Sequence, residues 1–210
     1  MLLVRIARLA GLAALVAAGL ARAAETAPLQ PFQADYQVLR NGKELGHATL
    51  ALREAGNGTW EFSNRTQGTK GMASMLGLDV AEKSTFRWRD GLPQGLSYSY
   101  SQDAAIKSRR RNTEFDWNAG EARSSDGKDT WTAPLQGNAM DRNSVTVALM
   151  SALKSGASNP TFPVVDKDHV GEQRYTVGRR EALSLPAGSI DAVRVDRQRD
   201  DNSKRTTTSW

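Results

Sequence analysis

A segment near the start of the chain, PFQADYQVLRNGKELGHATLALR at residues 31–53, most constrains what this sequence can fold into. Apolar and polar residues alternate before Asn41-Gly42 and again after it, as expected for two half-buried strands. Asn-Gly favours a type I′ turn, because both central residues of that turn need a positive φ. The segment therefore predicts an antiparallel hairpin.

The same pattern recurs along the chain. Short alternating segments are separated by turn-forming pairs such as Asn57-Gly58, Asp90-Gly91 and Asp126-Gly127. Regularly spaced short strands between Gly, Asn and Asp turns are typical of an antiparallel all-β fold. We therefore expect a single β-rich domain over residues 31–210, with mainly antiparallel strands.

One segment departs from the strand pattern and predicts the one principal α-helix, over residues 141–155. Asn138 or Asp141 is placed to cap its start, and Gly156 is placed to end it. We expect the helix to lie across an open end or face of the sheet. The apolar stripe that indicates it has the spacing i, i+3, i+4, i+7 and i+8, and consists of Val145, Ala148, Leu149, Ala152 and Leu153.

The first 23 residues have the features of a secretory signal peptide. Arg5 and Arg8 precede an apolar run over residues 9–20, and Ala21-Arg22-Ala23 supplies an A-x-A cleavage site. The run is too short to span a bilayer, although an uncleaved anchor helix is the alternative. We expect export to the periplasm with cleavage near Ala23, after which residues 24–30 form a flexible lead-in.

The charge balance argues against a nucleic-acid partner. The whole chain has 28 Lys and Arg against 23 Asp and Glu; without Arg5, Arg8 and Arg22 the count is 25 against 23, a net charge of only +2. A nucleic-acid binder is expected to be strongly basic. The chain has no Cys, so neither disulfides nor thiolate chemistry contribute to its stability or function.

Several short motifs follow one another in a particular order along the chain. They include Phe32, Ala34 and Tyr36, then Phe115, Asp116 and Trp117, then Asp141, Arg142 and Ser144, and lastly Gly178, Glu181, Leu183 and Trp210. This order resembles that of the exported bacterial proteins classed as domain of unknown function 3108. The resemblance implies an envelope β-fold, a curled sheet or incomplete barrel, and it implies no activity and no catalytic residues. Members usually continue past the final Trp, so we expect this domain to be truncated at its C-terminus.

Aromatic and methionine side chains are the candidates for a ligand site. Aromatic residues share faces at strand spacing, and residues 67–78 predict a single helical turn or an apolar flap. These side chains are candidates to line a cavity on the concave face of the sheet. The alternative is that they form the core, because aromatic cross-strand pairs stabilise such sheets. The selected residues are Trp60, Trp88, Tyr98, Tyr100, Trp117, Met72 and Met75.

A polar cluster at the expected helix start, Asp141, Arg142 and Ser144, has two interpretations. It forms an anion site at the free N–H groups of the helix, or it caps the helix, with Arg142 paired to a carboxylate of the sheet. Capping is the favoured interpretation.

A basic run, Arg109, Arg110 and Arg111, also has two interpretations. It binds phosphates of lipid head groups, or it is a solvated stretch that protects a sheet edge. On a strand, Arg109 and Arg111 point one way and Arg110 the other.

Catalytic and metal-binding motifs are weakly represented. His47 and His169 are the two histidines, and Asp166 and Asp168 accompany His169 in a polar segment. A metal site there is one interpretation, but scattered loop charges give the same pattern. No nucleophile elbow, H-E-x-x-H, Walker loop or G-x-G-x-x-G occurs. We therefore expect neither a metal nor a cofactor.

These observations favour a non-enzymatic envelope protein that binds an apolar or amphipathic ligand on the concave face of a curled sheet. A lipid or an envelope protein is the expected partner, and no transmembrane segment is expected after signal removal. Two alternatives stay open. One is a structural or assembly protein of the envelope that acts through an exposed sheet edge. The other is a hydrolase with a dispersed site that uses His47 or His169.

Overall fold

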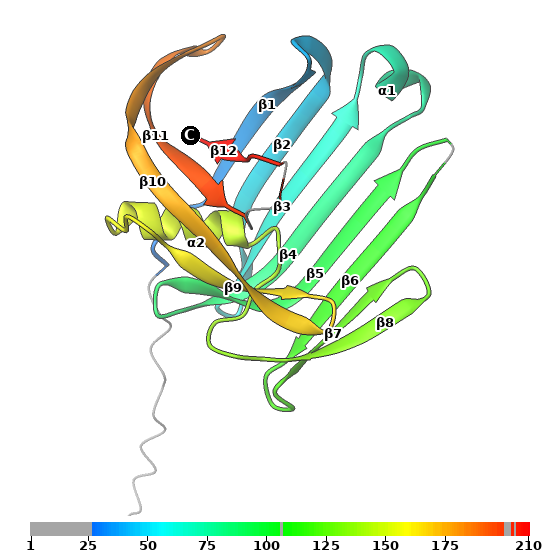
Figure 1. Ribbon diagram of the computed structural model, residues 1–210. Coiled ribbons are helices and arrows are strands. Elements are labelled where there is room, and N and C mark those ends of the chain that lie inside the picture. The colour runs from blue at the N-terminus through cyan, green and yellow to red at the C-terminus, as the bar shows by residue number, and fades with distance from the viewer. Residues whose placement is uncertain (1–26, 106, 200–202, 204) are drawn as a thin grey trace, which may run out of the picture.

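The computed structural model describes residues 27–105, 107–199, 203 and 205–210. The predicted signal peptide, residues 1–23, lies outside the described residues. The larger of two antiparallel sheets is an eight-stranded meander in which every strand pairs with its neighbours in sequence (Figure 1). Its strands are β1 (Phe32–Arg40), β2 (Lys43–Gly56), β3 (Thr59–Gly68), β4 (Asp79–Arg89), β5 (Leu92–Asp103), β6 (Arg109–Asp116), β7 (Glu121–Asp126) and β8 (Asp129–Pro134).

The turn chemistry predicted from the sequence is confirmed in this sheet. Asn41 and Gly42 have φ angles of 52° and 74°, the left-handed values that a type I′ turn needs. Asp90 and Gly91 adopt the same pair of conformations between β4 and β5. The opening hairpin aligns Phe32 with Leu52, so the apolar positions of both strands share one face.

The smaller sheet has four strands in the order β12, β11, β10 and β9. Its longest strand runs without a break from residue 169 to residue 185, because a register shift between Val177 and Arg180 absorbs an irregularity in the pairing. The last strand consists of two residues. The bounds are β9 (Thr161–Asp166), β10 (His169–Leu185), β11 (Gly188–Gln198) and β12 (Thr208–Ser209).

Helix α2 (Val145–Lys154) packs between the two sheets (Figure 1). Val147 packs with Phe62 and Phe86 of the larger sheet. Ala148 and its apolar neighbours on the helix pack with Phe162 and Val195 of the smaller one. Since burying a large apolar side chain stabilises a fold by about 1.5–3 kcal/mol, these two clusters hold both sheets to the helix.

The helix begins four residues later than the predicted residue 141. One carboxylate oxygen of Asp141 accepts hydrogen bonds from the backbone N–H groups of Asn143 and Ser144, both at 2.9 Å. This local turn keeps the backbone out of the helix until Val145. A second helix, α1 (Gly71–Met75), is the single turn predicted for this segment. In the described part of the chain, neither helix has the length and apolar character needed to cross a membrane.

Candidate functional site

The residues before α2 form a crossing segment, residues 138–144, that runs between the two sheets. The carbonyl of Ala139 accepts a hydrogen bond from the N–H of Gly95 on β5. Met140 forms a parallel bridge with Val164 on β9. Within this segment Asn138 is partly buried and Arg142 is exposed, whereas the other residues are buried. The crossing segment therefore fixes the position of the smaller sheet against the inner face of the larger one.

Asp141 is the buried centre of this segment, with 2% of its surface exposed. Its carboxylate accepts hydrogen bonds from the hydroxyls of Ser84 at 2.6 Å and Ser144 at 2.8 Å, besides the two backbone N–H groups. The amide of Asn143 donates to Ser84 Oγ and to the carbonyl of Phe62. Burial raises the pKa of Asp141, and these hydrogen bonds oppose the rise.

Arg142, next to this buried carboxylate, faces the inner surface of the larger sheet. Its Nη2 lies 3.3 Å from Glu82 Oε1, and its guanidinium carbon lies 5.7 Å from the centre of the Tyr100 ring. The hydroxyl of Tyr98 donates to the other oxygen of Glu82 at 2.9 Å. Burial, followed by the charge of Glu82, raises the pKa of Tyr98. Arg142 is thus held over the sheet by an ion pair and a cation–π contact.

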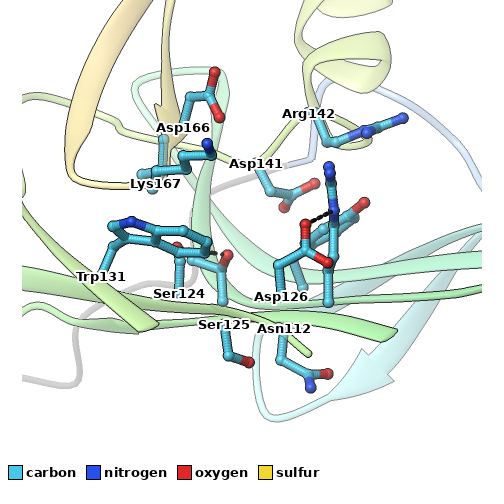
Figure 2. Close-up of a pocket in the computed structure, with 13 residues that line it drawn as sticks. Asn112, Ser124, Ser125, Asp126, Trp131, Asp141, Arg142, Asp166 and Lys167 are labelled. Atoms are coloured by element: carbon cyan, nitrogen blue, oxygen red, sulfur yellow. Dashed lines mark hydrogen bonds and ion pairs between the residues drawn. The ribbon is translucent and has the colours of Figure 1, made fainter. Parts of the chain in front are cut away.

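A pocket of about 80 Å³ opens beside Arg142, with room for several waters or one small head group. Its floor is the inner face of β5–β8 and its roof is the crossing segment with the β9–β10 turn. Figure 2 shows Lys167 of that turn above the Trp131 ring, with Nζ 5.2 Å from the ring centre. The lining side chains used below are Tyr98, Arg111, Asp126, Trp131, Asp141, Arg142 and Lys167.

Three cations border the pocket, namely Arg111, Arg142 and Lys167, and three carboxylates line it with them, those of Asp126, Asp141 and Asp166. Arg111 Nε donates to Asp126 at 2.7 Å, and Arg109 donates to the same carboxylate. Arg109 first, and then the charge of Arg111, hold the pKa of Asp126 below its usual range. Arg111 and Arg142 are each paired with a carboxylate, whereas Lys167 forms no ion pair among the described residues, so its ammonium is the cation most open to an anionic group.

The strand register extends this site across the sheet. One transverse row of directly paired residues changes from apolar on β1 and β2 to charged on β6 and β7. This row passes from the edge of the sheet into the pocket, so the inner face is amphipathic along one line. In order, it consists of Ala34, Leu50, Asn64, Glu82, Tyr100, Arg111 and Asp126.

Four buried polar side-chain atoms lack a hydrogen-bond partner among the described residues, namely Asn64 Oδ1, Trp88 Nε1, Gln94 Nε2 and Arg197 Nε. Asn64 belongs to the transverse row, and Arg197 lies on β11 of the smaller sheet. Burial, then the charges of Arg199 and, more weakly, Arg142, lower the pKa of Arg197. Buried polar groups are normally paired, so these atoms leave hydrogen-bonding capacity unused.

The predicted aromatic site residues separate into three groups. Tyr98 lines the pocket and Tyr100 lies in the transverse row beneath Arg142. Trp60 and Trp88 pack edge to face, 6.0 Å apart, in the core cluster under α2, which is the arrangement of the core alternative. Trp117 belongs to neither the pocket lining nor this core cluster.

Trp117 has a structural role, because its Nε1 donates a hydrogen bond to the carbonyl of Gly95 at 2.7 Å. A side chain at Gly95 would meet the Phe115 ring at 2.8 Å, so this close approach requires glycine. Met72 and Met75 lie on α1 with exposed fractions of 75% and 84%, and neither lines the pocket.

The basic run has the alternation predicted for a strand. Arg109 and Arg111 both bind Asp126, whereas Arg110 binds Asp103 on the other face. All three guanidinium groups are therefore engaged in ion pairs. Arg111 alone of the three lines the pocket beneath Arg142.

The two histidines lie outside the pocket. His47 is 3.5 Å from Glu44, and His169 is 3.1 Å from Asp168; both side chains are mostly exposed. Among residues that the structure describes, no three His, Asp or Glu side chains are grouped to hold a metal ion. The segment containing Asp166 forms the β9–β10 turn, and that turn contributes Lys167 to the pocket.

Glu82, Asp126 and Lys167 were not among the site residues predicted from the sequence, although all three shape the site. Alternation along β4 and β7 assigns Glu82 and Asp126 to a face, but it does not show which residues lie opposite them. Lys167 reaches Trp131 only through tertiary packing between the two sheets.

These features define a class of β-protein in which two antiparallel sheets, not closed into a barrel, hold one helix and a small polar pocket between them. The model of the family described as "Protein of unknown function (DUF3108)" matches residues 32–210. The chain belongs to this family, which confirms the resemblance inferred from the motifs.

The chain is similar to the crystal structure of a beta-barrel-like protein of domain of unknown function DUF1849 from Brucella abortus. The identity is 14%, the match covers 85% of this chain and 83% of that chain, and the TM-score is 0.45. The search of curated proteins found no match.

Proposed function

We propose that this protein is a non-enzymatic binding protein of the bacterial envelope that holds an amphipathic ligand with an acidic head group. The supporting observation is the transverse row of the larger sheet, which runs from Leu50 to Arg111 and ends at a pocket bordered by three cations. A ligand of matching polarity would lie along this row with its head at the pocket.

The head group would be held by charge-assisted hydrogen bonds. Arg111 and Arg142 present guanidinium groups from β6 and from the crossing segment, and Lys167 presents an ammonium from the opposite side. Guanidinium groups bind carboxylates and phosphates in bidentate fashion. Because Arg142 is half exposed and its contact to Glu82 is 3.3 Å, it can turn toward a bound anion at little cost.

The apolar part of the ligand would contact the β1–β2 side of the inner face. Ala34 and Leu50 are partly buried there, and Ala48 and Val80 lie one row further along the same face. Apolar contact of this kind contributes about 25 cal/mol per Å² removed from water. An envelope location is in keeping with the signal peptide predicted for residues 1–23.

Native mass spectrometry of the exported protein, purified without detergent, tests this proposal. We expect a mass adduct that organic extraction removes and that proves to be an acidic amphiphile. The Arg111→Gln/Arg142→Gln variant should lose the adduct, while Arg53→Gln on the outer face should keep it. An adduct-free protein that also fails to bind added acidic amphiphiles would overturn the proposal.

A second candidate function is assembly with an envelope protein through an open sheet edge. The observation that favours it is β1, which over nine residues pairs only with β2 among the described strands. Such an edge can accept another strand. Crosslinking in cells from position 37 on β1 tests this candidate. A specific protein adduct would support assembly through this edge, whereas a lipid adduct would favour the proposed binding of an amphiphile.

A further inference from the structure

One end of the molecule carries exposed apolar and basic side chains. We call this end the rim and define it by Leu39, Arg40, Lys43, Met72, Met75 and Lys107. Met75, Met72 and Leu39 have exposed fractions of 84%, 75% and 53%. Scattered single apolar residues are common on protein surfaces, but clustered ones indicate a contact surface.

The rim is continuous, because hydrogen bonds join its three parts. The N–H groups of Thr69 and Lys70, just before α1, donate to the carbonyl of Leu45 on β2. The N–H of Ala105, in the β5–β6 connection, donates to the carbonyl of Leu76 just after α1 at 2.8 Å. The β1–β2 turn, α1 and the β5–β6 connection therefore form one edge, at the upper end of the larger sheet in Figure 1.

The methionines of the rim are held outward by the way α1 is anchored. A side chain at Gly68 would meet Ala73 of α1 at 2.7 Å, so the helix sits directly on β3 through this glycine. The N–H of Leu78 donates to the carbonyl of Ala73 and closes the turn. With Ala73 facing the sheet, Met72 and Met75 face solvent, and no residue of α1 is buried.

The rim is positively charged once its ion pairs are considered. Glu44 is paired with Lys70, and Asp103 with Arg110. No ion pair is formed by Arg40, Lys43 or Lys107 within the described ranges. These three charges flank the exposed Leu39 and the two methionines, so the surface combines apolar tips with unpaired cations.

We propose that the rim docks onto the anionic surface of a lipid bilayer. Apolar side chains at turn tips insert at the boundary between head groups and acyl chains, and each basic residue near an anionic surface adds about 1 kcal/mol. The β10–β11 turn, with the exposed Leu185 and Ile190, lies at the same end of the molecule in Figure 1. Docking does not depend on the proposed ligand, but it would bring the inner face of the sheet close to the lipids from which an amphiphile is taken.

Flotation of the mature protein with vesicles tests this proposal. The probes are vesicles of phosphatidylcholine mixed with phosphatidylglycerol, and vesicles of phosphatidylcholine alone. We expect binding to the anionic vesicles that weakens as salt is raised, because screening acts on exposed charges. Met72→Ser/Met75→Ser should reduce the partition coefficient about tenfold or more, and Arg40→Glu/Lys43→Glu should abolish the preference for phosphatidylglycerol.

The matched control is Met150→Ser, which changes a methionine that is 36% exposed on α2, away from the rim; its binding should equal that of the unmodified protein. Circular dichroism checks that each variant is folded. Equal binding to both kinds of vesicle, no binding to either, or undiminished binding of the double methionine variant would overturn the proposal. Affinity for a soluble acidic amphiphile, measured without vesicles, should be the same in the rim variants, so failure here is distinguishable from failure of the proposed function.

Discussion

The carboxylate of Asp141 accepts a 2.6 Å hydrogen bond from the hydroxyl of Ser84, a residue 57 positions earlier in the chain. Both residues are almost completely buried. This bond joins the crossing segment to the centre of the larger sheet, and Arg142 follows directly after it. The position of the pocket roof therefore depends on a buried polar contact rather than on apolar packing alone.

We expect Asp141→Ala to lower the free energy of unfolding by about 3 kcal/mol, because the Ser84 hydroxyl and two backbone N–H groups lose their acceptor inside the protein. Urea unfolding measures the change. A double-mutant cycle with Ser84→Ala should give a coupling energy of about 0.5–3 kcal/mol. Asp168→Ala, at an exposed carboxylate, is the control and should change stability by no more than about 0.5 kcal/mol.

Phe86 should be among the residues most sensitive to truncation. Its side chain is fully buried and packs with Val147 of α2, and its ring centre lies 5.2 Å from the ring centre of Trp88. Phe86→Ala should destabilise the protein by about 3–5 kcal/mol, since it leaves a cavity between sheet and helix. Tyr36→Ala, at a site that is 51% exposed, should cost far less. Similar losses in both variants would contradict the assignment of the core.

The ion pairs of Asp126 predict a dependence of stability on acid pH. Its pKa is lowered in the folded state by Arg109 and Arg111. The pairs therefore contribute stability above the unfolded pKa of about 3.9, and that contribution is lost as pH falls through the folded value. Between pH of about 5 and 3, the urea midpoint should fall less steeply for Asp126→Asn than for the unmodified protein. The same flattening in Asp129→Asn, the exposed carboxylate directly opposite Asp126 across the β7–β8 turn, would show that the effect is not specific to these pairs.

Local features of the fold followed from the sequence, because local chemistry decides them. The Asn41-Gly42 turn depends on two residues that tolerate positive φ. The apolar stripe of α2 depends on helical spacing, and the structure buries Val145, Ala148 and Leu149 as that spacing predicts. The pairing of Arg109 and Arg111 with one carboxylate likewise follows from alternation along a strand.

The start of α2 and the composition of the pocket did not follow from the sequence, because distant partners determine them. Asp141 holds the backbone in a turn by accepting from the N–H of Asn143, and the hydroxyl of Ser84 donates to the same carboxylate from β4 of the sheet. Alternation assigned Trp60 and Trp88 each to one face of its own strand, but it could not show that α2 covers them. Lys167 enters the pocket only because the smaller sheet folds back over Trp131.

The most direct test of the account is a fluorescence titration of the mature protein with a dansyl-labelled undecanoic acid, comparing Arg142→Gln with Arg53→Gln. Each variant removes one cation that is paired with a glutamate, the first on the inner face and the second on the outer face. Loss of a charge-assisted hydrogen bond is worth about 1.5–3 kcal/mol. The account predicts saturable binding that weakens about tenfold or more in Arg142→Gln and is unchanged in Arg53→Gln. Equal affinities in both variants, or no saturable binding at all, would contradict it.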